Sequence, residues 1–121
     1  MVRPLFDTNV LIDYLAGVVA ARDELARYED PAISVISWME VLVGAHPEVE
    51  PATRRFLSRF ALVEIDAAIA ERAVTIRRGR RIRLPDAIIQ ASAETRSLLL
   101  VTRNTRDFDP ASPSVRVPYV L

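Results

Sequence analysis

The chain contains no cysteine and no lysine, and it has a single histidine, His46. Without cysteine it can form neither disulfides nor thiolate metal sites, and it has no thiol nucleophile. Without lysine it lacks Schiff-base chemistry and the lysine of a phosphate-binding loop. A single histidine also excludes a catalytic pair of histidines. These absences leave the carboxylates as the main candidates for chemistry.

Long hydrophobic runs and an imbalance of charge are also missing. The longest apolar run, residues 32–45, is broken by Glu40 and falls short of the roughly 20 residues that span a bilayer. Asp7 and Asp13 interrupt any signal-peptide core. We therefore expect a soluble, cytoplasmic protein without a membrane partner. Sixteen arginines balance sixteen acidic residues, so the net charge alone indicates no class of partner.

The pattern of apolar residues predicts one α/β domain spanning residues 1–121. Short apolar runs predict strands at residues 2–6, 32–36, 62–65, 98–102 and 115–120. Helical spacing predicts helices at residues 8–15, 18–28, 37–45, 52–60, 67–78 and 87–96. Strands that alternate with helices favour a mainly parallel sheet covered by helices. Pro118 places the last strand at an edge of that sheet.

Acidic and amide side chains follow several of these strands. Asp7 comes directly after the first strand, and Glu40 lies one turn past the second. Asn104 and Asp107 follow the strand at residues 98–102, and Asp86 begins the helix that leads into that strand. The carboxyl ends of parallel strands meet at one edge, where ligands bind in open α/β sheets. We therefore expect these side chains to lie together.

Carboxylates that crowd together repel one another and raise one another's pKa unless a cation neutralises them. Oxygen ligands without histidine or cysteine select a hard ion, Mg²⁺ or Mn²⁺. Such an ion polarises a phosphoryl oxygen and acidifies a bound water, which favours hydrolysis of a phosphodiester. We predict a metal and catalytic site made of Asp7, Glu40 and Asp86, completed by Asn104 or by Asp107 as a fourth catalytic carboxylate. Glu40 is the candidate general base.

Each acid also has a purely structural interpretation. Asp7 and Asp86 suit the first turns of helices, where carboxylates accept free amide hydrogens. Glu40 completes a capping box with Ser37. Asp66, after the strand at residues 62–65, is predicted to be a helix N-cap. Asp13, one turn after Asn9, is either solvated or supports the acidic site from behind.

Five of the seven positions from residue 77 to residue 83 are arginine. Such a run is often a solvated loop, but its closeness to Asp86 favours contact with the phosphates of RNA. We name Arg80, Arg81 and Arg83 as candidate RNA contacts. Arg103 is a fourth candidate, with an internal ion pair as the alternative.

Four stretches resemble PIN-domain ribonucleases of the VapC type, the toxins of bacterial and archaeal toxin–antitoxin pairs. They are residues 7–13, 34–40, 84–89 and 100–108. The resemblance implies a single PIN domain whose five-stranded parallel sheet has the order 3-2-1-4-5. It implies an Mg²⁺-dependent endoribonuclease site at Asp7, Glu40, Asp86 and a fourth position, a homodimer, and an antitoxin that covers the helices and obstructs the pocket. The fourth position departs from the family, since Asn104 stands where aspartate is frequent and Asp107 lies one turn later.

Two other functions fit parts of this pattern. A PIN-like module that binds RNA or protein without cutting it would tolerate the change at the fourth position. A phosphatase whose own Asp7 forms an aspartyl-phosphate during the reaction would also place an aspartate after the first strand. That class needs a second aspartate two residues on, where this chain has Asn9, and a lysine, which the chain lacks.

Overall fold

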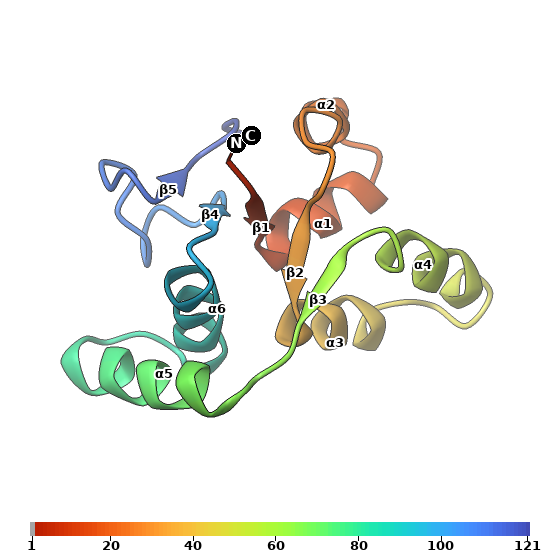
Figure 1. Ribbon diagram of the computed structural model, residues 1–121. Coiled ribbons are helices and arrows are strands. Elements are labelled where there is room, and N and C mark those ends of the chain that lie inside the picture. Colours follow the sequence, from red (N-terminus) through yellow and green to blue (C-terminus); the bar gives the residue numbers. More distant parts are fainter. Residues whose placement is uncertain (1) are drawn as a thin grey trace.

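The computed structural model describes residues 2–121 and contains one five-stranded sheet in the order β3-β2-β1-β4-β5 (Figure 1). Its strands, all parallel to their neighbours, are β1 (Pro4–Phe6), β2 (Ala32–Ser34), β3 (Ala61–Val63), β4 (Leu99–Val101) and β5 (Val115–Arg116). The helices are α1 (Thr8–Leu15), α2 (Val19–Leu25), α3 (Val35–Val43), α4 (Glu50–Leu57), α5 (Ala67–Gly79) and α6 (Leu84–Thr95). The predicted fold class and strand order are confirmed.

Helices cover both faces of the sheet, with α1, α2 and α4 on one side and α5 and α6 on the other (Figure 1). Successive strand residues point to opposite faces, and the two core clusters follow this rule. Leu5 packs in the cluster under α5 and α6, whereas its neighbour Phe6 packs in the cluster under α1, α2 and α4. Both side chains are fully buried. The central strand β1 therefore anchors both layers.

The winding of the chain reverses between β1 and β4. From β1 the chain adds β2 and then β3 on one side, and afterwards places β4 on the other side of β1. A crevice opens at the carboxyl ends of the strands where such a reversal occurs. Asp7 follows β1 and Thr102 follows β4, so both residues lie at this point.

The start of α3 corrects one prediction. The second strand ends at Ser34 rather than at residue 36, because the Ser34 hydroxyl accepts a hydrogen bond from the Ile36 amide at 3.1 Å and caps α3. Ser37 therefore lies inside the helix, fully buried, and the predicted capping box between Ser37 and Glu40 is wrong. In contrast, the predicted N-cap at Asp66 is confirmed by its hydrogen bond from the Ile69 amide.

Other differences concern the ends of elements. Helix α6 begins at Leu84 rather than at residue 87, because Pro85 fits the first turn of a helix. The last strand lies at the sheet edge as predicted, but it ends at Arg116 rather than at residue 120. In residues 2–121, none of the helices combines the length and the apolar character needed to cross a membrane.

Candidate active site

The five side chains predicted to form a site line one cleft of about 590 Å³, here called the acidic cleft. They are Asp7, Glu40, Asp86, Asn104 and Asp107. They come from the N-cap of α1, from α3, from the first turn of α6 and from the loop after β4. Parallel strand ends and helix starts thus bring together residues that are far apart in the sequence.

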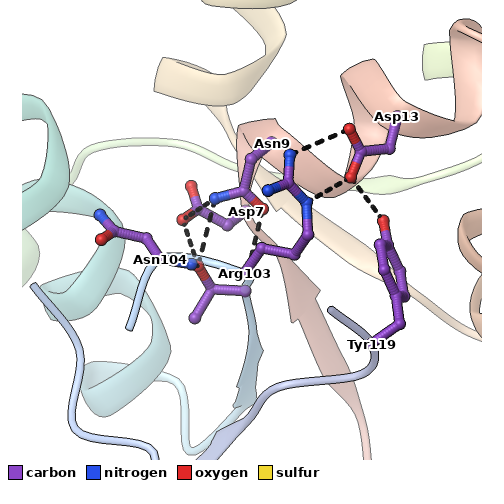
Figure 2. Close-up of polar contacts among 7 residues, drawn as sticks. Asp7, Asn9, Asp13, Arg103, Asn104 and Tyr119 are labelled. Atoms are coloured by element: carbon purple, nitrogen blue, oxygen red, sulfur yellow. Dashed lines mark hydrogen bonds and ion pairs between the residues drawn. The ribbon is translucent and has the colours of Figure 1, made fainter. Parts of the chain in front are cut away.

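Asp7 is the buried centre of the acidic cleft, with 3% of its surface exposed. Its Oδ1 caps α1 by accepting the Thr8 amide hydrogen at 2.7 Å. Its Oδ2 accepts the Thr102 hydroxyl at 2.8 Å and the Asn9 side-chain amide at 3.2 Å (Figure 2). The structural interpretation of Asp7 as a helix cap is therefore confirmed, and the same carboxylate also lines the cleft, as the functional interpretation requires.

Burial raises the pKa of Asp7 to about 6, and the charges of Asp86 and Glu40 act in the same direction. The hydrogen bonds from Thr102 and Thr8 oppose this rise by stabilising the carboxylate. A bound cation would offset both the cost of burying this carboxylate and its repulsion by the neighbouring acids. Neighbouring carboxylates in the cleft therefore raise the pKa of Asp7, as the sequence analysis predicts for crowded acids.

Glu40 is held by a residue that the sequence analysis missed. The Thr8 hydroxyl donates a hydrogen bond to Glu40 Oε1 at 2.7 Å and lies 2.8 Å from the Ser37 hydroxyl oxygen. Because Ser37 is fully buried, it fixes Thr8 from inside the protein. Glu40 is thus oriented by Thr8 and Ser37 and does not take part in a helix cap.

Asp86 is coupled to the other acids through their charges. Burial is the main cause that raises its pKa, and Asp107 and Glu40 raise it further. The guanidinium groups of Arg83 and Arg106 oppose this rise. Asp86 therefore belongs electrostatically to the acidic cleft, although it also occupies the first turn of α6.

Asn104 and Asp107 both reach the cleft and hold each other. The Asn104 side-chain amide donates to Asp107 Oδ2 at 2.9 Å, and the Asp107 main-chain amide donates to Asn104 Oδ1 at 3.1 Å. This reciprocal pair forms one turn of the loop after β4. Either residue can present an oxygen to the cleft, so the alternatives left by the sequence remain open.

The donor set suits a hard divalent cation in the kind of atoms that it offers. All five side chains offer oxygen atoms. Asp86 and Glu40 raise the pKa of Asp7, and Asp107 and Glu40 raise the pKa of Asp86. Among residues 2–121, however, no three histidine, cysteine, aspartate or glutamate side chains are already gathered closely enough to hold a metal ion. Uncompensated carboxylates repel one another, so binding an ion requires these side chains to converge.

A second cleft, of about 750 Å³, adjoins the first and is lined mainly by arginine. We call it the arginine groove, and its lining is Arg77, Arg81, Ile82, Arg83, Arg106 and Asp107. Arg83, Arg106 and Asp107 line both clefts. Arg77 belongs to the arginine run that the sequence analysis assigned to phosphate contact, although neither Arg77 nor Arg106 is among the four residues named individually as RNA contacts.

The arginines near the acidic cleft differ in whether they have an acidic partner. In the described part of the chain, nine arginines lie within 4.0 Å of a carboxylate oxygen. Of the other seven, five fall at residues 77–83. Unpaired guanidinium groups therefore gather beside the acidic cleft.

Two of the arginines predicted to contact RNA, Arg80 and Arg103, instead bind other residues of the protein. Arg80 donates to the Gln90 side-chain oxygen at 2.6 Å and to the Asp107 carbonyl oxygen, which ties the end of α5 to α6 and to the loop after β4. Arg103 forms the internal ion pair that was its alternative, with Asp13 at 2.5 Å. Arg81 and Arg83 remain free to contact a phosphate.

Comparison with known proteins agrees with this fold. The family model for the PIN domain matches residues 5–111. The chain is 37% identical to Ribonuclease VapC10 of Mycobacterium tuberculosis over 97% of this chain and 93% of that protein. It is 31% identical to the tRNA(fMet)-specific endonuclease VapC of Shigella flexneri over 90% of this chain and 92% of that protein.

A solved structure is also similar along nearly its whole length. A chain of a toxin–antitoxin complex from Klebsiella pneumoniae shares 46% of residues with this chain, with a TM-score of 0.92. The match covers 98% of this chain and 99% of that one. Together with the matching family model, these similarities show that the chain belongs to the PIN-domain family and, within it, to the VapC ribonucleases.

Proposed function

We propose that this chain is an Mg²⁺-dependent endoribonuclease, able to use Mn²⁺, that acts as the toxin of a toxin–antitoxin pair. The observation that carries the proposal is the buried Asp7, whose pKa is raised to about 6 inside a cleft shared with Glu40 and Asp86. The adjoining arginine groove supplies positive charge where a phosphate backbone would lie. Similarity to proteins named as VapC nucleases supports the same activity.

The metal would be held by Asp7, Glu40 and Asp86, with Asn104 or Asp107 as the fourth ligand. When bound, such an ion polarises a phosphoryl oxygen and lowers the pKa of a coordinated water. The oxygen-only donors favour Mg²⁺ or Mn²⁺ over softer metals.

The protein side chains then have distinct tasks. Thr102 and Asn9 fix the orientation of the Asp7 carboxylate through its Oδ2. Thr8 fixes Glu40, which can accept the proton of the attacking water as general base. Arg81 and Arg83 bind the phosphates that flank the scissile one, and Arg106 stands between the two clefts.

The partners are an RNA substrate and an antitoxin protein. The similar proteins are named as a ribonuclease and as a tRNA endonuclease, and the similar solved chain is part of a toxin–antitoxin complex. Apolar side chains exposed on α1 and α3, such as Ile12, Leu15, Met39 and Val43, suit contact with another protein. We further propose that the chain forms a homodimer and acts in the cytoplasm.

The test uses protein freed of antitoxin, a structured RNA and Mg²⁺. We expect the wild type to cleave the RNA, EDTA to stop cleavage, and Asp7→Asn to be inactive while still binding RNA. Asp66→Asn is the matched control, because Asp66 caps α5 outside the acidic cleft. If both wild type and variant bound the RNA but left it intact, the nuclease proposal would be rejected in favour of a PIN module that binds without cleaving. For the toxin role, expression without antitoxin should arrest growth, and growth unimpeded by active protein would contradict it.

A further inference from the structure

Asp13 lies one turn beyond Asn9 on α1 and is nearly buried, with 7% of its surface exposed. Its carboxylate binds Arg103 through two bonds, Nε to Oδ2 at 2.5 Å and Nη2 to Oδ1 at 3.0 Å. A third donor is the Tyr119 hydroxyl, 2.7 Å from Oδ2 (Figure 2). Three elements distant in the sequence, α1, the loop after β4 and the C-terminal segment, thus meet at one carboxylate.

The charges of this cluster are stable near neutral pH. Burial opposes ionisation of Asp13, but the bonds from Arg103 and Tyr119 outweigh it, and the pKa of Asp13 falls below its usual value. Burial and the Asp13 carboxylate raise the pKa of Tyr119 above its usual value. The phenol therefore stays protonated and acts as a hydrogen-bond donor to an ionised carboxylate.

The cluster connects to the acidic cleft through Asn9. While the Arg103 side chain is held by Asp13, its main-chain amide donates to Asn9 Oδ1 at 3.1 Å. The other end of the Asn9 side chain donates to Asp7 Oδ2 at 3.2 Å and to the Thr102 hydroxyl at 3.3 Å. Figure 2 shows this path from Tyr119 through Asp13, Arg103 and Asn9 to Asp7. It ends on the carboxylate of Asp7, which lines the acidic cleft and is a proposed metal ligand.

Tyr119 lies beyond β5, where the chain forms no regular secondary structure. Its ring packs against the core cluster under α1, α2 and α4, and the next two residues are exposed. Its hydroxyl is the polar anchor of the C-terminal segment on Asp13. Nothing in the local sequence around Tyr119 indicates this role, because Asp13 is 106 residues away.

We propose that Tyr119 is a positioning residue for the carboxylate of Asp7, acting through Asp13, Arg103 and Asn9. This inference rests on the proposed nuclease function, because its purpose is to keep Asn9 and Asp7 in the orientation that metal binding and water attack require. Groups that orient a metal ligand without touching the metal themselves affect metal affinity and activity. The C-terminal segment would then be part of the active enzyme rather than a passive end.

The chain offers a matched control for this proposal. Glu24 binds Arg116 at 2.6 Å and accepts the Tyr28 hydroxyl at 3.3 Å, which makes a second carboxylate–arginine–tyrosine cluster. Its three side chains do not line the acidic cleft. Tyr28→Phe removes the same chemical group from the same kind of cluster. It therefore separates a loss of stability from a loss of positioning.

The test compares Tyr119→Phe with Tyr28→Phe at a temperature where both variants are folded. We expect Tyr119→Phe to lower kcat about tenfold while KM for RNA changes less than about twofold, and Tyr28→Phe to leave both near the wild-type values. In Asp13→Asn protein, adding Tyr119→Phe should cause much less further loss, since both changes break one path. Equal loss of kcat in the two tyrosine variants, or independent losses in the double variant, would overturn the proposal.

A second readout does not depend on activity. The chain has only three side-chain amides, Asn9, Asn104 and Gln90, so their NMR signals are readily assigned in ¹⁵N-labelled protein. We expect Tyr119→Phe to shift the Asn9 amide signal and leave Gln90 unchanged, and Tyr28→Phe to shift neither. An unmoved Asn9 signal would refute the positioning path. If the wild type failed to cleave RNA, the nuclease proposal would fall, and the Asn9 signal would still decide whether Tyr119 positions this network.

Discussion

Thr8, in the first turn of α1, donates a hydrogen bond to Glu40 of α3 at 2.7 Å. The Ser37 hydroxyl lies 2.8 Å from the same Thr8 oxygen. A hydroxyl has one hydrogen and two acceptor lone pairs. With Glu40 ionised, Thr8 gives its hydrogen to the carboxylate and Ser37 supplies the second bond. The partly buried Thr8 hydroxyl and the buried Ser37 hydroxyl, in series, therefore set the direction of the proposed general base.

Replacing Thr8 by valine keeps the shape of the side chain but removes the donor to Glu40. We expect kcat for RNA cleavage to fall about tenfold, the size typical when a group that orients an active-site side chain is lost. Thr8→Ser retains the hydroxyl and should keep most of the activity. Initial rates at saturating RNA measure the effect. Equal activity of the valine and serine variants would show that Thr8 does not orient Glu40.

The raised pKa of Asp7 predicts an unusual dependence of stability on pH in metal-free protein. Its pKa is about 6 in the folded protein and 3.8 in the reference state. Between these values the folded state binds more protons than the unfolded state, so this group makes the protein less stable as pH rises from about 4 to 6. The loss levels off near pH 7, about one unit above the folded pKa, and amounts to about 3 kcal/mol.

Asp7→Asn lacks this titration, so the free energy of unfolding should depend less on pH in the variant than in the wild type. Urea unfolding at pH 4.5 and pH 7, both in EDTA, measures the difference. The comparison is between the two pH values within each protein, because asparagine also loses the acceptor of the Thr102 and Asn9 bonds. Parallel pH profiles for the two proteins would contradict the raised pKa.

Metal binding to the acidic cleft should stabilise the folded protein. A cation neutralises carboxylates that otherwise repel one another, and a ligand that binds only the folded state raises the unfolding temperature. We expect near-saturating Mg²⁺ or Mn²⁺ to raise it by about 5 °C in the wild type. Asp86→Asn should lose most of this shift, whereas Asp66→Asn should keep it even if its starting stability is lower. The same metal-dependent shift in Asp86→Asn would exclude Asp86 as a ligand.

The arginine groove predicts a specific salt dependence of RNA binding. Arg77 and Arg81 line the groove without a carboxylate partner, so each can bind a phosphate and release a counterion. Each change to alanine should weaken binding of single-stranded RNA in EDTA and reduce the slope of log K against log salt by about 0.7. The control is Arg72→Ala on the same helix, because Arg72 is paired with Glu94 at 2.8 Å. An unchanged slope for Arg77→Ala and Arg81→Ala would place the RNA elsewhere.

The sequence predicts the elements and the place of the acids well, because both follow from local rules. Apolar runs identify strands, and the parallel arrangement then brings the residues after them to one edge. The same local rules mislead at Ser37, which satisfies the pattern of a capping box with Glu40. The N-cap of α3 is instead Ser34, three residues earlier. Ser37 is buried inside the helix and contacts Thr8, so it cannot be the cap.

The contacts that tune the site depend on distant residues and could not be predicted from the pattern. Thr102 reaches Asp7 across 95 positions, and Tyr119 reaches Asp13 across 106. The arginines illustrate the same limit. Closeness in sequence suggested Arg80 and Arg103 as RNA contacts, but Gln90 and Asp13 lie near enough in space to bind them.

The arginine groove contains no lysine or histidine, and an arginine side chain stays protonated at every pH at which the protein would be studied. The positive charge of its arginines is therefore constant from weakly acidic to weakly alkaline solution, and lysine acetylation has nothing to act on in this chain. In the proposed mechanism, variation of cleavage with pH would originate in the carboxylates of the acidic cleft and in the metal-bound water, and not in the arginines. A change of buffer pH should therefore alter the proposed bond breaking while the charge that the arginines offer to RNA stays the same.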